Sequence, residues 1–312
     1  MNKRMKQIVD SCYRIDLDIT AQCNRTCSFC PRVDDIIYPN MKKEMSLDTV
    51  AEVLKQCVKY GYNGWIELAG RGEPTLHKHF EMIVSMIADH PQKTWKLRLT
   101  TNGFSIEKWW DSVSPKLDWL ILNSYDSEEE YKERCEKYEK LPNDQYVQNE
   151  YKPDGTPIEE INKMSYEDKA NPLPDGFQWK HSFNNRAGFF SNQSQALLCT
   201  HPHTQIFINY DGDYQMCCND WLNQVTIGNI HERRLFDMYA NDEKLKFIRK
   251  ALQNARRDLI APCSKCDDST DMSVMKRLKK DHGDNWFDEL KNMSILVSEA
   301  EEGKYITRTI IE

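Results

Sequence analysis

The sequence predicts an α/β protein whose strands lie parallel in one sheet. Segments with the alternating pattern of a strand and segments with the pattern of an amphipathic helix succeed one another through the first half of the chain. Each predicted strand in that half ends in a short polar stretch before the next helix. A helix between two strands makes a right-handed crossover, so this succession favours parallel strands. We therefore expect an α/β barrel, complete or partial, with its chemistry at the carboxyl ends of the strands.

The elements of the first half follow from these patterns. Residues 13–20 alternate polar and apolar side chains and predict the first strand. The helix after it has Ser46 in position to cap its N-terminus, an apolar face, and Gly61 to end it. The same patterns predict strands at 64–70, 95–103 and 117–125 and helices at 79–90 and 105–113.

The second half has a different character. Residues 127–178 are highly charged and then broken by prolines, which predicts an insertion: a short solvated helix followed by irregular chain. A strand pattern returns at 177–188, and two alternating runs around Asp211 and Gly212 predict a hairpin. An amphipathic helix is expected at 235–252.

The composition narrows the functional classes. The chain has 312 residues and a formal net charge of −7, with basic and acidic residues interleaved, so a nucleic-acid partner is not expected. No apolar run is long enough to cross a bilayer, and no apolar segment follows the basic N-terminal residues as in a signal peptide. We expect a cytoplasmic protein without a membrane partner. Its 11 cysteines occur at ligand-like spacing, which indicates metal binding rather than disulfides.

Three cysteines form a C-x3-C-x2-C pattern on the loop after the first predicted strand, namely Cys23, Cys27 and Cys30. Three thiolates can hold three irons of a 4Fe–4S cluster and leave the fourth iron open to a substrate or cofactor. The alternative is a zinc knuckle or a partly filled four-cysteine site, since zinc also favours closely spaced thiolates. No fourth ligand is near in the sequence, so we prefer the cluster.

At these cysteines the sequence resembles the radical SAM superfamily, in which an aromatic residue, here Phe29, precedes the last cysteine. The stretch GRGEPTLH resembles the family's second motif, which implies that Gly72, Glu73 and Pro74 contact the methionyl amino group of S-adenosylmethionine (SAM). The resemblance implies a partial (β/α)6 barrel of the TIM type over residues 10–190. It also implies that the open iron binds SAM and that an electron from the cluster cleaves SAM to a 5′-deoxyadenosyl radical, which abstracts hydrogen from the substrate.

Lesser candidates stand at other strand ends. The family resemblance implies that Thr101, Asn102, Asn123 and Ser124 face the sugar and sulfonium of SAM, although turn-forming polar residues are an equal alternative. Arg186 follows the strand expected at 177–188 and suits a carboxylate of the cofactor or substrate; the alternative is a surface arginine.

A second set of cysteines lies in the second half of the chain: Cys199, Cys217, Cys263 and Cys266. Four thiolates can close a 4Fe–4S cluster completely, which suits electron transfer or positioning, whereas a structural zinc site is the alternative. The set resembles a Twitch domain, the shortened relative of the SPASM domain, and implies one auxiliary cluster in a hairpin-and-helix domain at 191–270, followed by a tail at 271–312. Cys218 is not needed by this count. We expect it to be idle, to exchange as a ligand, or to donate hydrogen to a substrate radical.

The expected function is a radical SAM reaction on a small hydroxylated or sugar-like molecule, ending in oxidation or epimerisation. An electron donor such as flavodoxin or ferredoxin is the expected protein partner. Radical modification of a ribosomally synthesised peptide is the alternative within the superfamily. A non-catalytic zinc-binding module is the alternative of another class.

Overall fold

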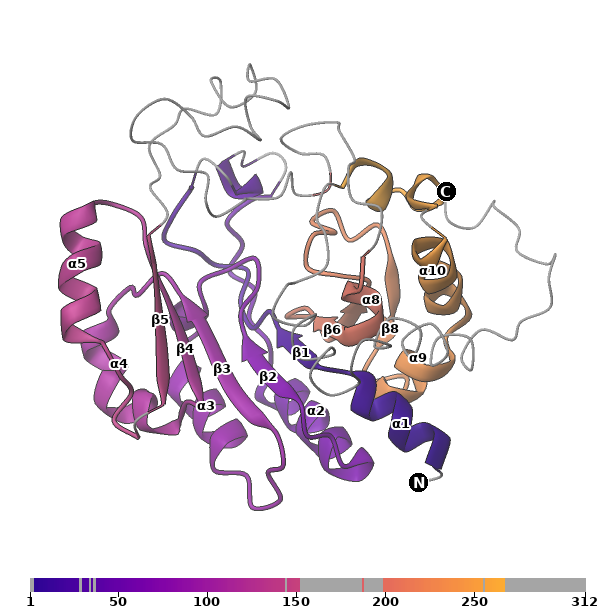
Figure 1. Cartoon of the computed structure of the whole chain (residues 1–312), viewed down its shortest axis with the longest axis horizontal. Coiled ribbons are helices and arrows are strands. Elements are labelled where there is room, and N and C mark those ends of the chain that lie inside the picture. The colour runs from indigo at the N-terminus through magenta and orange to yellow at the C-terminus, as the bar shows by residue number, and fades with distance from the viewer. Residues whose placement is uncertain are drawn as a thin grey trace, which may run out of the picture.

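The computed structural model of the chain describes residues 3–27, 30–33, 35, 38–143, 145–151, 187, 199–254 and 256–266. Within these residues the centre is one eight-stranded sheet in the order β5-β4-β3-β2-β1-β6-β7-β8 (Figure 1). The strands are β1 (Arg14–Leu17), β2 (Trp65–Leu68), β3 (Lys96–Thr101), β4 (Trp119–Ser124), β5 (Tyr146–Tyr151), β6 (Gln205–Ile208), β7 (Asp213–Gln215) and β8 (Thr226–Asn229). Neighbours from β5 to β6 are parallel, and β7 and β8 are added antiparallel.

The helices lie beside the sheet and at its β6–β8 end (Figure 1). They are α1 (Lys3–Ser11), α2 (Leu47–Tyr60), α3 (Phe80–Ala88), α4 (Ile106–Val113), α5 (Glu128–Lys137), α8 (His201–Thr204), α9 (Leu235–Asn241) and α10 (Glu243–Gln253). The predicted caps of α2 are confirmed: Ser46 Oγ accepts from the Thr49 N–H at 3.0 Å, and Gly61 ends the helix at φ 59°. Glycine adopts this left-handed conformation without the steric cost of a Cβ atom.

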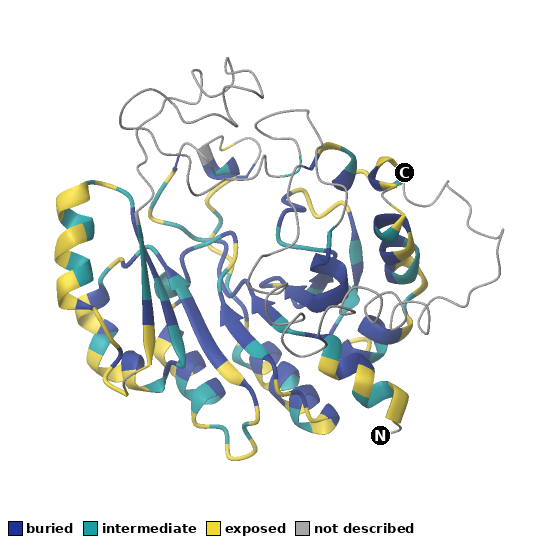
Figure 2. Ribbon diagram, in the orientation of Figure 1, coloured by how far each residue is buried: buried dark blue, intermediate teal, exposed yellow. Residues whose placement is uncertain are grey.

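The sheet has an apolar face and a polar face. Leu17 and Leu68 have no exposed surface and belong to one buried cluster with apolar side chains of α2, α3 and α4. The alternate positions Asp16, Glu67 and Arg98 are also buried, with 3–4% of their surface exposed. Strand side chains alternate between faces, so the polar set lies on the face opposite the helices. Figure 2 shows the buried strands at the centre of the molecule.

The predicted fold class is confirmed, with two differences in detail. The strand β6 pairs with β1 instead of following β5, so the sheet of the described strands stays open. The strand β5 lies inside the segment 127–178, where irregular chain was predicted, and that prediction is wrong for residues 146–151. Val147 is the one buried side chain among those described in β5, which explains why this edge strand has no clear apolar pattern. The solvated helix expected at the start of the segment is confirmed as α5.

Other predictions in the second half have mixed outcomes. The hairpin is confirmed by β6 and β7, with Gly212 at φ 83°. The single helix expected at 235–252 is two helices, because Asp242 is extended and caps α10 by accepting from the Lys244 and Leu245 N–H groups. The strand expected at 177–188, apart from Ala187, lies outside the described residues, as do residues 152–176 and the tail at 271–312.

The sheet continues across the expected domain boundary near residue 190, since β6 adds to β1. Side chains from both sides of this boundary share one buried core. No helix in the described part of the chain is long and apolar enough to span a bilayer.

Candidate active site

The first cysteine loop follows β1 at the carboxyl edge of the sheet. Asn40 binds the main chain of Cys23 twice: its Oδ1 accepts from the Cys23 N–H at 3.0 Å, and its Nδ2 donates to the Cys23 carbonyl at 3.0 Å. The N–H of Cys30 donates to the carbonyl of Cys27 at 2.9 Å. Main-chain contacts therefore hold the loop in shape. Phe29 lies outside the described residues.

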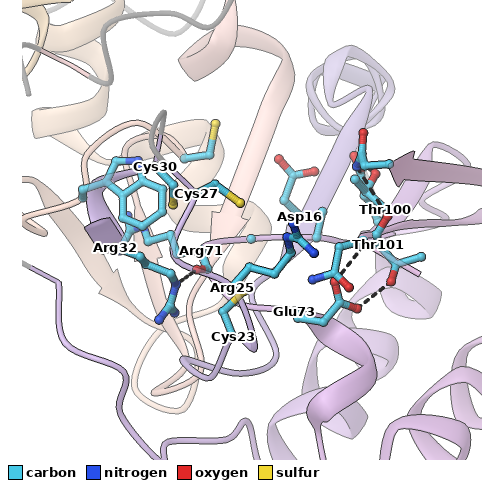
Figure 3. Close-up of a pocket in the computed structure, with 18 of the residues that line it drawn as sticks. Asp16, Cys23, Arg25, Cys27, Cys30, Arg32, Arg71, Glu73, Thr100 and Thr101 are labelled. Carbon is cyan, nitrogen blue, oxygen red and sulfur yellow. Dashed lines mark hydrogen bonds between the residues drawn. The ribbon is translucent and has the colours of Figure 1, made fainter. Parts of the chain in front are cut away.

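A cavity of about 290 Å³ opens beside this loop. The predicted site residues that line it are Cys23, Cys27, Cys30, Gly72, Glu73, Thr101, Asn102, Asn123 and Cys218. Figure 3 shows the labelled cysteines on one side of the view and Glu73 and Thr101 on the other. Cys218 and Trp221 reach the same cavity from the C-terminal third of the chain. Segments far apart in the sequence thus form one site.

Glu73 is buried and organises the loop after β2. Its Oε1 accepts from the Thr101 hydroxyl at 2.6 Å and from the Thr75 N–H and hydroxyl at 3.1 and 2.7 Å, and its Oε2 accepts from the Asn102 N–H at 2.8 Å. Burial raises the pKa of Glu73, although these hydrogen bonds oppose the shift. Pro74, which is buried and does not line the cavity, begins the 3-10 turn that Glu73 caps. The carboxylate therefore joins the ends of β2 and β3.

The two candidates at the end of β4 have different surroundings. Asn123 lines the cavity, and its Nδ2 donates to the Thr101 carbonyl at 3.5 Å. Ser124 has no exposed surface and is not among the cavity-lining residues; its hydroxyl accepts from Arg134 at 3.3 Å. Arg186 lies outside the described residues.

Arg25 ties the cysteine loop to the chain after β4. Its guanidinium forms a two-point ion pair with Asp126, in which Nη1 donates to Oδ2 at 3.0 Å. The same group lies 5.0 Å from the ring centroid of Tyr125. Both Arg25 and Tyr125 line the cavity. A planar guanidinium suits this combination of a paired carboxylate and an aromatic ring.

The second set of cysteines also comes together. Burial raises the pKa of the Cys217 thiol, and the nearby thiols of the set raise it further, as does Cys218. Burial and the neighbouring Cys199 and Cys266 likewise raise the pKa of Cys263, against the opposing effect of Arg257. Cys217 therefore lies with the second cysteine set, whereas the adjacent Cys218 lines the cavity beside the first cysteine loop.

Comparisons with known proteins agree with this geometry. Residues 17–147 match the model of the radical SAM superfamily, and residues 199–267 match the model of the SPASM iron–sulfur cluster-binding domain. The chain therefore carries a radical SAM domain followed by a SPASM domain.

Individual relatives extend this result. The SAM-dependent 2-deoxy-scyllo-inosamine dehydrogenase of Niallia circulans is 22% identical over 257 residues, which cover 81% of this chain and 92% of the relative. A GTP 3′,8-cyclase of Synechocystis sp. is 31% identical over 112 residues, or 35% of this chain and 33% of that protein. The crystal structure of BtrN with AdoMet and 2-DOIA has a TM-score of 0.64 at 20% identity and covers 82% of this chain and 93% of its own, which supports the fold.

This radical SAM enzyme uses SAM, a 4Fe–4S cluster with an open iron and one auxiliary 4Fe–4S cluster. The two groups of thiols fit these cofactors. Among the described residues, no three His, Cys, Asp or Glu side chains are arranged to hold a single metal ion. Ligands of a cluster bind different iron atoms and so stand farther apart than ligands of one zinc ion. The first three thiols line one cavity, and the second four lie close enough to affect one another's pKa, which fits the thiolate ligand sets of such clusters.

Several cavity residues were not predicted from the sequence: Arg14, Asp16, Arg25, Arg32, Glu67, Arg71, Thr100, Tyr125 and Trp221. A signal for some of them was present. Asp16 and Glu67 are charged residues at alternate positions of buried strands. Such residues on an otherwise apolar strand indicate a paired charge or a site.

Gly72 packs against the cysteine loop so closely that a side chain does not fit. A Cβ atom there would lie 2.0 Å from the Thr20 carbonyl oxygen and 2.6 Å from the Gln22 carbonyl oxygen, both main-chain atoms. The neighbouring Glu73 N–H donates to the Gln22 carbonyl at 2.8 Å. We expect Gly72→Ala to push the two loops apart, to lower the free energy of unfolding by about 1–3 kcal/mol and to weaken SAM binding about tenfold.

Gly61→Ala is the matched control for this variant. Nothing lies within 4 Å of a Cβ atom at Gly61, so that change affects only the left-handed end of α2. Thermal unfolding and equilibrium binding of SAM should show a loss of stability in both variants and a loss of SAM affinity in Gly72→Ala alone. Unchanged SAM affinity in Gly72→Ala would contradict the importance of this contact.

Proposed function

We propose that the chain oxidises a secondary alcohol of a small cyclitol or sugar to a ketone by radical dehydrogenation. One observation carries the proposal: the first cysteine loop, the Glu73 loop and Cys218, which is next to a cysteine of the second set, all line one cavity. A substrate bound there would lie near both clusters. The relative that covers 81% of this chain is by name a dehydrogenase of an aminocyclitol, which supports this reaction over peptide modification and over a zinc module.

We assign the cofactor-binding roles to the residues that the sequence predicts. Cys23, Cys27 and Cys30 are the proposed ligands of the open cluster, and the auxiliary cluster has the proposed ligands Cys199, Cys217, Cys263 and Cys266. The proposed SAM-binding residues are Phe29, Gly72, Glu73, Pro74, Thr101, Asn102, Asn123, Ser124 and Arg186. Support comes from the cavity. Of the proposed ligands and SAM-binding residues in the first half of the chain, these line it: Cys23, Cys27, Cys30, Gly72, Glu73, Thr101, Asn102 and Asn123.

The electron balance of the dehydrogenation gives the auxiliary cluster the role of electron acceptor. An open cluster held by Cys23, Cys27 and Cys30 would, with bound SAM, supply a 5′-deoxyadenosyl radical on one-electron reduction. Loss of a hydrogen atom from the carbinol carbon, followed by loss of one electron and one proton, converts the alcohol to a ketone. The electron needs an acceptor near the substrate, and a cluster with four cysteine ligands is suited to electron transfer. Flavodoxin or ferredoxin is the proposed donor of the first electron, in the cytoplasm.

Epimerisation is the second candidate, because the Cys218 thiol lines the cavity. A thiol can return a hydrogen atom to a substrate radical, which would end the reaction without net oxidation. Dehydrogenation gives an oxidised product, whereas epimerisation gives a product without net oxidation that contains hydrogen from solvent. Analysis of the product therefore distinguishes the two reactions.

Isotope transfer tests the proposal. The enzyme, prepared without oxygen and reduced, is incubated with 2-deoxy-scyllo-inosamine carrying deuterium on its ring carbons. We expect deuterium in 5′-deoxyadenosine, a ketone product and about one SAM consumed per ketone. Deuterium transfer with an epimer that gains hydrogen from solvent, lost in Cys218→Ser, would replace dehydrogenation by epimerisation. SAM cleavage without deuterium transfer would exclude this substrate.

A further inference from the structure

Three strands contribute a cluster of charged and polar side chains to the cavity region. Arg14 and Asp16 on β1, Glu67 on β2 and Thr100 on β3 line the cavity. Asp16 is the register partner of Glu67, and Glu67 is the register partner of Arg98. The two carboxylates therefore stand side by side on neighbouring strands. We call these five residues the strand cluster.

Arg14 lies between the two carboxylates. Its Nε is 2.5 Å from Asp16 Oδ1 and 3.1 Å from Glu67 Oε2, and its Nη2 donates to Asp16 Oδ2 at 3.1 Å. Glu67 is also paired with Arg98 and accepts from the Thr100 hydroxyl at 2.7 Å. Between 4% and 11% of each charged side chain in the cluster is exposed. These are buried charges at a cavity wall.

The two carboxylates are unequally compensated. Burial, opposed by Arg14 and assisted by the charge of Glu67, raises the pKa of Asp16. Burial acts on Glu67 too, but Arg14 and Arg98 together outweigh it and lower the pKa of Glu67. Among the contacts above, Glu67 has Arg14, Arg98 and Thr100 as partners and Asp16 has Arg14, so Asp16 gains most from an additional hydrogen-bond donor or a positive charge.

The other arginines on the cavity wall already donate to oxygen atoms of the chain. Arg25 is paired with Asp126, and Arg32 and Arg71 both donate to main-chain carbonyl groups. A carboxylate has about four acceptor positions, more than the contacts above fill on Asp16. Asp16 therefore keeps acceptor capacity for a ligand on this wall.

We propose that Asp16 and Glu67 select the substrate, and that it is an unphosphorylated polyol that presents hydroxyl or ammonium donors to these two carboxylates. The inference rests on the proposed function, because it places the substrate in the same cavity. A phosphate group would bring negative charge against two buried carboxylates, at a cost that an alcohol or an ammonium group does not carry. Donors of the ligand would instead form charge-assisted hydrogen bonds.

Calorimetric binding to the SAM-loaded, cluster-containing enzyme tests the selection without relying on turnover. The probes are the amine 2-deoxy-scyllo-inosamine, the neutral myo-inositol and the anionic myo-inositol 1-phosphate, of which the last two differ only in the phosphate. We expect the amino and neutral cyclitols to bind and the phosphate to bind at least about tenfold more weakly. Equal or stronger binding of the phosphate, or no binding of either unphosphorylated probe, would overturn the inference. Deuterium transfer to 5′-deoxyadenosine is scored separately, so failure of the dehydrogenation would be visible on its own.

Two isosteric variants test whether Asp16 and Glu67 are the residues that discriminate between these ligands. Asp16→Asn and Glu67→Gln each remove one negative charge, and we expect each to weaken binding of the aminocyclitol about tenfold. We also expect each to improve binding of the phosphate relative to the amine, a change in preference that a purely structural role would not produce. Glu52→Gln, on the outer helix α2, is the control and should leave both affinities unchanged. An unaltered preference in both cavity variants, with iron content and unfolding temperature retained, would overturn the assignment. If one variant does not fold, the other decides.

Discussion

Replacing Cys23, Cys27 and Cys30 together by alanine is expected to abolish SAM cleavage and to leave a folded protein with one cluster. The three side chains line the cavity on a loop at the carboxyl edge of the sheet, outside the shared apolar core. The loop also has main-chain contacts that alanine preserves, such as those between Asn40 and Cys23. The variant should therefore contain about four irons per chain where the unmodified enzyme contains about eight.

Iron and acid-labile sulfide per chain, with formation of 5′-deoxyadenosine under reducing conditions, measure this outcome. Cys135→Ala is the matched control, because Cys135 lies on the solvated helix α5 and is expected to bind no cluster. It should retain both the iron content and SAM cleavage. SAM cleavage by the triple variant would contradict the assignment of the open cluster. Loss of all iron would show that the auxiliary site needs the first cluster in order to form.

The fold was predictable wherever a strand has one apolar and one polar face. Alternation in residues 13–20 gives β1, and the caps Ser46 and Gly61 give the limits of α2, because these signals depend on neighbouring residues alone. The strand β5 was missed because it is an edge strand with few apolar side chains. The pairing of β6 with β1 was also missed. Strand order depends on contacts between segments about 190 residues apart, for which a single sequence has no local signal.

The site likewise has features with a local sequence signal and features that depend on contacts between distant segments. The cysteine spacing and the residues Gly72 and Glu73 are local patterns, and the structure brings them into one cavity. The strand cluster is not local: Asp16 and Glu67 become neighbours only through the register of β1 and β2. Alternate charged residues in the sequence indicate that something pairs with them, but not which strand supplies the partner.

Arg71 connects the SAM-motif loop to the loop that follows Cys217 and Cys218. Its guanidinium donates to the Asp220 carbonyl at 2.7 Å and to Asn223 Oδ1. It also lies 5.0 Å from the ring centroid of Phe207. With 3% of its surface exposed, it is a buried cation whose charge is stabilised by acceptors and a ring from the C-terminal third of the chain.

The main chain of Arg71 extends this connection to the first half of the molecule. Its N–H donates to Asp18 Oδ1 at 3.0 Å, and its carbonyl accepts from Arg32, which follows the first cysteine loop. Arg71 therefore contacts three segments: the chain directly after β1, the chain directly after the first cysteine loop, and the loop that follows Cys217 and Cys218. Since Cys218 on that last loop lines the cavity proposed to bind substrate, a shift of the loop would change the distance between a substrate there and the proposed auxiliary cluster.

We expect Arg71→Met to uncouple SAM cleavage from substrate oxidation. Methionine approximates the length of the side chain but leaves the Asp220 carbonyl and Asn223 without their charged donor, at a cost of about 1.5–3 kcal/mol for each lost hydrogen bond to a charged group. The loop carrying Cys218 should then lose its fixed position, so that hydrogen abstraction is less often followed by electron removal. The measured result should be several molecules of 5′-deoxyadenosine per ketone, in place of about one.

The control is Arg256→Met, which removes an exposed arginine whose partner is Asp258 and should leave the ratio of 5′-deoxyadenosine to ketone unchanged. Arg71→Lys retains the charge without the planar two-point geometry, so it should restore stability more than coupling. Iron content and the reduction potential of the auxiliary cluster distinguish a displaced loop from a lost cluster, since loss would lower the iron content to about four per chain. A ratio near one in Arg71→Met, with both clusters present, would mean that the two halves of the cavity keep their arrangement without this arginine and that coupling depends on the shared core instead.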